Sequence, residues 1–261
     1  MRIEKNGLAI DDIKGWWQVA PPKDPAKHWV DGRSAKETAR AWLENVPSSP
    51  PCEVTSLLSS HRDFADLVIG RVEPEALLEF DDRPGPRNAD LAIMARDMHG
   101  VVAITVEAKA DETFDDLVAV VFDAASERLL TAPRSGGVAR VVELAQSILP
   151  PKAPGTTAVT ALRYQLLTAV AGTLAYAEML NAHRGVLVVH EFHTAHTSSR
   201  LLAGNAADLD RFVARLSQGA VRSIEPGVLA GPFNVPGEPL FPCQVSLYIG
   251  KAVRRIRTLS P

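Results

Sequence analysis

The sequence predicts an α/β protein of the α+β type, with a mixed central sheet flanked by helices. Residues 90–95 and 101–110 are short apolar runs on either side of a turn that ends in Gly100, and together they predict a β-hairpin. Residues 185–193 follow several helical segments and are apolar on both faces, as a buried central strand should be. A hairpin before the helices and a strand after them indicate a mixed sheet rather than a doubly wound one.

Helical periodicity of the apolar residues predicts most of the other elements. The expected helices are 34–46, 114–129, 138–149, 160–181 and 205–219, with weaker helical spacing at 56–69 and a short strand at 76–80. Ser34 and Glu37 form the pattern of a capping box at the start of the first helix. Asp115 and Asp116 would lie in the first turn of the second helix, and Asn205 would cap the last one.

The helix expected at 160–181 has one small and polar side. The residues on this side are Gln165, Thr168, Gly172, Thr173 and Tyr176. A helix with small residues along one side can lie close against its neighbour. We therefore expect this side to pack on the sheet that carries the hairpin.

Length and composition favour one domain that spans residues 1–261. Within it we expect a core at 34–218, an N-terminal extension at 1–33 and a C-terminal extension at 219–261. The content of 46% hydrophobic and 23% charged residues is that of an ordinary soluble globular protein. Because the formal net charge is −3, any surface that binds nucleic acid would be a local patch.

The N-terminal residues are charged and lack the apolar core of a signal peptide. No apolar run approaches the ~20 residues that a membrane span needs. The two cysteines, Cys52 and Cys243, form neither a metal-binding spacing nor a disulfide framework, so we expect buried thiols in a reducing compartment. These features predict a cytoplasmic protein with no membrane partner.

The hairpin carries the residues with the clearest chemical meaning. Strand period two places Glu107 and Lys109 on one face, and a symmetric hairpin places Asp90 opposite Glu107. Two carboxylates pressed together in a buried sheet need a proton, a cation or a basic neighbour. Lys109 is one such neighbour, and a hard divalent cation is another. A slip of one residue would put the acids on opposite faces, so this prediction depends on the register.

The pattern of Asp90, followed after a β-turn by Glu107-Ala108-Lys109, resembles the signature of the PD-(D/E)XK phosphodiesterase superfamily. Ala89 stands where that motif has the proline that names it. The wider pattern is similar to that of a bacterial group within this superfamily, and the matching segments are SAKETARAWL, VEAKADETF, LRYQLL and VLVVHEF.

This resemblance implies a restriction-endonuclease-like αβββαβ core and metal-dependent hydrolysis of phosphodiester bonds in nucleic acid, in DNA more than in RNA. Asp90 and Glu107 would bind Mg²⁺ or Mn²⁺, with the Ala108 carbonyl as a further ligand. Lys109 would position the attacking water or neutralise charge in the transition state, and Gln165 would orient a ligand or the water. Nucleases of this fold often cut duplexes as dimers, so a homodimer is also implied.

Several neighbouring residues leave alternatives open. By the same resemblance Glu37 or Glu44 could add an acid from the first helix, whereas Glu37 already has a capping role. Arg83 and Arg87 lie just before the hairpin and are either solvated or phosphate-binding. The same choice applies to the C-terminal basic residues, which are Lys251, Arg254, Arg255 and Arg257.

Other chemistries have less support. A strand spacing of three places His190 and His193 on opposite faces, which is wrong for sharing a zinc ion, and His196 lies beyond the strand. No dinucleotide-binding loop, Walker loop or nucleophilic serine elbow occurs. Two rival hypotheses remain: a non-catalytic descendant of the same fold that binds nucleic acid or protein, and an enzyme of unrelated chemistry that uses the same acids for acid–base work.

Overall fold

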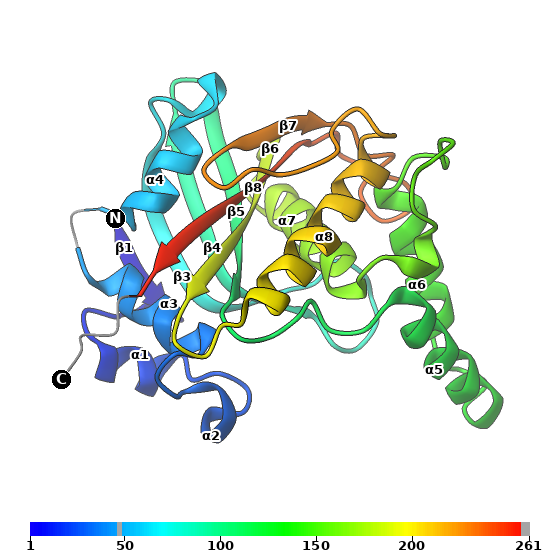
Figure 1. Cartoon of the computed structure of the whole chain (residues 1–261), viewed down its shortest axis with the longest axis horizontal. Helices are drawn as coiled ribbons and strands as arrows, with labels where there is room; N and C mark the ends of the chain where they lie inside the picture. Colours follow the sequence, from blue (N-terminus) through cyan, green and yellow to red (C-terminus); the bar gives the residue numbers. More distant parts are fainter. Residues whose placement is uncertain (46–48, 257–261) are drawn as a thin grey trace.

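Eight strands form one mixed sheet in a computed structural model, which describes residues 1–45 and 49–256 (Figure 1). Their order across the sheet is β2-β1-β3-β4-β5-β6-β8-β7. The strands are β1 (Arg2–Lys5), β2 (Leu8–Ala9), β3 (Val68–Leu78), β4 (Arg87–Asp97), β5 (Gly100–Lys109), β6 (Arg184–His193), β7 (Leu229–Phe233) and β8 (Ser246–Arg255). β3, β4 and β5 are antiparallel neighbours, whereas β6 is parallel to both β5 and β8. The prediction of a mixed sheet in an α+β fold is confirmed.

Helices cover both faces of this sheet (Figure 1). The N-terminal helices α1, α3 and α4 share one apolar core with the sheet, and α5 to α8 share a second core on the opposite face. The helices are α1 (Ile13–Val19), α2 (Pro25–His28), α3 (Ser34–Leu43), α4 (Cys52–Ser59), α5 (Val118–Thr131), α6 (Gly137–Ile148), α7 (Tyr164–Met179) and α8 (Ser199–Leu216), with 3-10 turns at Arg62–Phe64 and Val159–Ala161. No helix in the described ranges is both long and apolar enough to cross a membrane.

The hairpin is longer than its sequence signals indicated. β4 and β5 pair from Asp97 opposite Gly100, which leaves Met98 and His99 as the two turn residues. β3 spans eleven residues, although only 76–80 was predicted as a strand. Two irregularities make β3 hard to recognise from the sequence. A register shift follows Ile69, and Glu75, further along the strand, adopts the left-handed backbone region. Both features interrupt the period-two pattern that identifies a strand.

The helix starts differ more from prediction than the helix bodies. α6, α7 and the strand β6 lie close to their predicted ranges, but α5 begins at Val118, so Asp115 and Asp116 precede it. α8 begins at Ser199 and is capped by Ser198, whose side chain accepts from the Leu201 N–H. The segment 56–69 is the end of α4, a 3-10 turn and the start of β3.

Two predicted caps are wrong. Asn205 lies inside α8, and its side-chain amide donates to the Glu112 carbonyl. The N-cap of α3 is Arg33, without a side-chain cap bond, so Ser34 and Glu37 form no capping box. Val46, which was expected in the same helix, lies outside the described residues. Asn205 binds a carbonyl 93 positions away in the sequence, and Glu37 instead accepts from the Gly32 N–H and from Arg40.

The two cysteines are exposed, which corrects the prediction of buried thiols. Cys52 is the first residue of α4, and Cys243 lies in the loop before β8. The segments expected as extensions also join the sheet: β1 pairs with β3, and β8 pairs with β6 along ten residues. Lys251 and Arg255 are therefore strand residues rather than part of a free tail, while Arg257 lies outside the described residues.

The small side of α7 packs on the sheet as predicted. Gly172 is so close to the sheet that an added Cβ would lie 3.1 Å from Cγ of Arg87. Thr173 and Thr105 are buried and their hydroxyl oxygens are 2.6 Å apart. Because the Thr173 hydroxyl also donates to the Ala169 carbonyl at 2.9 Å, the Thr105 hydroxyl is the donor in the contact between α7 and β5.

The direction of the hydrogen bond from Thr105 to Thr173 predicts that Thr173→Val and Thr105→Val lower the stability by different amounts. Thr173→Val leaves the buried Thr105 hydroxyl without an acceptor and should lower the free energy of unfolding by about 1–2 kcal/mol. Thr105→Val leaves Thr173 bound to Ala169, so it should lower stability by clearly less, and the double variant should resemble Thr105→Val. Urea unfolding of the three variants measures these differences. Equal losses in the two single variants would contradict the assigned donor.

Candidate functional site

Asp90 and Glu107 lie at matching ends of neighbouring strands. The last ladder pair of the hairpin is Leu91 with Val106, and one further step along the same register places Asp90 opposite Glu107. At this point the Asp90 carboxylate accepts a hydrogen bond from the Ala108 backbone N–H at 2.6 Å. The register expected from a symmetric hairpin is therefore present, and the acid of β4 binds the backbone of the Glu-Ala-Lys segment.

Lys109 completes the predicted group. Its ammonium nitrogen is 2.8 Å from Oε1 of Glu107, as expected for two side chains on one face of a strand. Only 4% of each of these side chains is exposed. Burial lowers the pKa of Lys109, and the nearby acids Glu112 and Asp90 oppose this shift. Burial also raises the pKa of Asp90, although Lys109 and the Ala108 N–H favour its charged form.

Arg87, at the start of β4, binds the other oxygen of Glu107. Both carboxylate oxygens of Glu107 are therefore paired with a cation, Lys109 on Oε1 and Arg87 on Oε2. Arg83, which precedes β4, instead pairs with Asp81 and Glu143. The two arginines that sequence reasoning treated together thus have different roles, because only Arg87 belongs to the strand that ends beside Glu107.

Three further acids near this group were not expected from the sequence. Glu75 on β3 receives a hydrogen bond of 2.6 Å from the Asn88 amide and has a φ of 50°, a strained value for a strand residue. Burial and the neighbouring Asp90 raise the pKa of Glu75 to about 7. Burial is the largest single influence on Glu112 and raises its pKa, but the charge of Lys109 and the hydrogen bonds to Ser34 and Asp111 together lower the pKa below its ordinary value. The only signal for Glu75 was its position after a proline in an otherwise strand-like segment.

The third acid is Asp115, in the loop before α5. Together with Asp116 it lines a pocket of ≈ 400 Å³ that also contains Arg87, Gln165 and Tyr164. The Oε1 atom of Gln165 is buried and has no hydrogen-bond partner within the described part of the chain. Gln165 therefore lines this pocket together with Arg87, and Arg87 connects the pocket with Glu107.

The carboxylates of Asp90 and Glu107 are of the right chemical type to bind a hard divalent ion, but they are few. Carboxylate oxygens are the ligands that Mg²⁺ and Mn²⁺ prefer. Within residues 1–45 and 49–256, no group of three or more His, Cys, Asp or Glu side chains is placed to hold a metal ion. Glu37 accepts from the Gly32 N–H and from Arg40, and Glu44 pairs with Arg254. Asp90 and Glu107 thus fit an ion only if Arg87 gives up its contact with Glu107.

Two of the histidines that the sequence analysis considered pair with acids. His190 is buried and 3.0 Å from Glu53 on α4, and His193 is 3.3 Å from Glu191. Glu191 also lies beside Lys109 in the parallel register of β5 and β6, which places another acid next to the site. No sequence motif marked Glu191.

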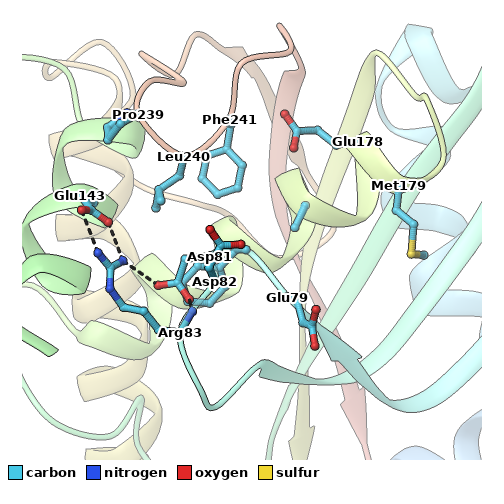
Figure 2. Close-up of a pocket in the computed structure, with 12 residues that line it drawn as sticks. Glu79, Asp81, Asp82, Arg83, Glu143, Glu178, Met179, Pro239, Leu240 and Phe241 are labelled. Atoms are coloured by element: carbon cyan, nitrogen blue, oxygen red, sulfur yellow. Dashed lines mark hydrogen bonds and ion pairs between the residues drawn. The ribbon is translucent and has the colours of Figure 1, made fainter. Parts of the chain in front are cut away.

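A larger pocket of ≈ 790 Å³ lies away from this group, where the end of β3 approaches α6 and α7 (Figure 2). Its charged lining is mainly acidic, with Glu79, Asp82 and Glu178 in addition to the Arg83–Glu143 pair drawn in Figure 2. Such a surface repels phosphate groups. On this side Arg83 is paired with Asp81 and Glu143.

Comparison with known proteins identifies a family. The model of a family described as a domain of unknown function, DUF6946, matches residues 9–255. The chain belongs to the DUF6946 family. No curated protein and no solved structure matches it. The matched region contains every strand from β3 to β8 and all residues of the site.

The raised pKa of Glu75 predicts a pH-dependent effect of Glu75→Gln. The folded state keeps a proton up to a pKa of about 7, whereas the unfolded chain loses it near 4.5. The wild-type protein therefore loses stability as the pH rises from 4.5 through 7, by about 2–3 kcal/mol in total. The glutamine removes this loss, so its stability relative to wild type should rise by that amount between pH 4 and pH 8. Chemical denaturation at both pH values measures it, and a pH-independent difference would contradict the assignment.

Proposed function

We propose that this protein hydrolyses phosphodiester bonds in nucleic acid, DNA in preference to RNA, with a divalent ion bound by Asp90 and Glu107. One observation carries the proposal: Asp90 binds the Ala108 N–H at 2.6 Å while Lys109 binds Glu107 at 2.8 Å. Two acids and an amine from adjacent strands therefore meet at one end of the sheet. This is the arrangement that the PD-(D/E)XK resemblance implies.

The succession of elements supports the same assignment. α3 and α4 precede the three antiparallel strands β3, β4 and β5, and α5 to α7 lead to β6, which is parallel to β5. This succession is compatible with the αβββαβ core of restriction-endonuclease-like proteins. A cytoplasmic location and action as a homodimer are parts of the same proposal.

A bound Mg²⁺ or Mn²⁺ would supply Lewis acidity and a more acidic water molecule. The residues of the chain have complementary roles. Lys109 holds its ammonium group within 2.8 Å of Glu107, where a phosphate oxygen that gains negative charge would be stabilised. Its lowered pKa also makes it a better proton donor than an exposed lysine. Ala108 orients Asp90 through the backbone, which restricts the carboxylate to one direction.

A second candidate function is a non-catalytic module that binds nucleic acid or protein. The observation that favours it is the pairing of both Glu107 oxygens with Arg87 and Lys109. A carboxylate neutralised in this way is a satisfied structural ion pair and needs no metal. The choice between the two functions therefore depends on whether a divalent ion can compete for Glu107.

Cleavage assays test the first candidate. The protein is incubated with supercoiled plasmid, linear duplex DNA, single-stranded DNA and RNA, each with Mg²⁺, with Mn²⁺ or with a chelator. We expect cleavage that depends on the ion, and a loss of at least about a hundredfold in Lys109→Ala because a charge that stabilises the transition state is removed. Asp90→Asn should have a similar effect.

Asp97→Asn is the matched control. Asp97 is a buried acid on the same strand, but it lies at the hairpin end and pairs with Arg184 at 2.6 Å. This control should lose stability and retain cleavage. Equal cleavage by Lys109→Ala and wild type would sink the hydrolase proposal, and nucleic-acid binding without cleavage by either would support the second candidate.

A further inference from the structure

We infer that Arg87 is an internal competitor of the divalent ion, and that its guanidinium moves from Glu107 into the pocket beside Gln165 when the ion binds. The inference rests on the proposed metal site. It adds a regulatory element to that site, because the ion would be bound only at the expense of an ion pair within the protein.

The starting state is a compensated group of charges. Asp90 and Glu107 are two acids, and Arg87 and Lys109 are two bases, so the four side chains together carry no formal net charge. Both oxygens of Glu107 have a cation partner. A divalent ion gains little electrostatic attraction from a neutralised carboxylate, and it cannot share the space that the guanidinium occupies.

The pocket that would receive the Arg87 guanidinium is already present in the structure. Arg87 lines the pocket of ≈ 400 Å³, whose wall contains Gln165, Asp115 and Asp116. Oε1 of Gln165 is a buried acceptor with no partner among the residues described. The charge of Asp115 already acts on the Arg87 guanidinium. A guanidinium that left Glu107 would therefore find a neutral acceptor and carboxylates within the same pocket.

The structure allows this movement without leaving a buried charge alone. Glu107 would keep its contact of 2.8 Å with Lys109, so the carboxylate would stay paired. The Nε atom of Arg87 is buried and has no partner in the described ranges, which means that the present position does not satisfy all its donors. The stem of Arg87 packs against Gly172, where an added Cβ would lie 3.1 Å from Cγ. The stem is therefore held while the head group has two acceptor sites.

The first experiment measures Mn²⁺ affinity by isothermal titration calorimetry and by electron paramagnetic resonance of free Mn²⁺. Arg87→Met keeps an apolar stem against Gly172 and removes the competing cation. We expect it to bind Mn²⁺ at least about tenfold more tightly than wild type. In this variant no ion pair between residue 87 and Glu107 has to break before the ion can bind. Arg87→Gln serves as a second variant in case one of them folds poorly, and thermal unfolding checks both.

The second experiment tests the destination of the guanidinium. Gln165→Leu and Asp115→Asn remove acceptors from the pocket, and asparagine tolerates the left-handed backbone of Asp115, which has a φ of 50°. Each should weaken Mn²⁺ binding severalfold in wild type and leave it unchanged in the Arg87→Met background. A weakening of equal size in both backgrounds would mean that these residues act on the ion directly, and the inferred movement would be wrong.

The outcomes separate this inference from the proposed function. If Mn²⁺ binds wild type through Asp90 and Glu107, as judged from Asp90→Asn and Glu107→Gln, and Arg87→Met has unchanged affinity, the competitor role fails while the metal site stands. If neither wild type nor Arg87→Met binds Mn²⁺, the metal site itself fails. Tighter binding by Arg87→Met that is lost in Arg87→Met/Asp90→Asn supports both.

Discussion

The central constraint on this structure is the burial of opposite charges where β4 and β5 separate. Asp90 and Glu107 would repel each other in a low-dielectric interior if they were alone. The chain places Arg87 and Lys109 on Glu107 and a backbone N–H on Asp90, so the buried carboxylates are paired or hydrogen-bonded. Removal of either cation changes the balance for the whole group, which is why the electrostatics of this site are coupled to its stability.

The surrounding fold determines how closely these charges approach. The small side of α7 lies directly on the sheet, and Gly172 leaves room for the stem of Arg87. On the other side, the segment after β5 brings Glu112 towards Lys109 and towards Ser34 at the start of α3. The site is thus built at one end of the sheet from elements that begin or end there, rather than in the larger acidic pocket near Arg83 (Figure 2).

This arrangement has two chemical interpretations that differ only in the position of one guanidinium. With Arg87 on Glu107, the group is a structural ion-pair cluster. In the state that we propose, with Arg87 in the pocket beside Gln165, the same two acids would present oxygen atoms to a hard cation. A side chain with two alternative acceptor sites changes its preferred position when a ligand binds only one of the two forms. In the proposed state Glu107 would keep Lys109 as its partner, which it contacts at 2.8 Å in the structure.

The sequence by itself determined the hairpin and the shared face of Glu107 and Lys109, because strand alternation and turn residues are local properties. The register depended on where the turn lies, and the structure places the turn at Met98 and His99. The sequence also determined the approximate positions of α6, α7 and β6. Only the tertiary structure decided which charges meet. Glu75 on a distorted strand, Asp115 in a loop and the separation of Arg83 from Arg87 depend on contacts between segments far apart in the chain. Desolvation and Coulomb interactions act through space, so the pairing of buried charges is set by packing and not by sequence spacing.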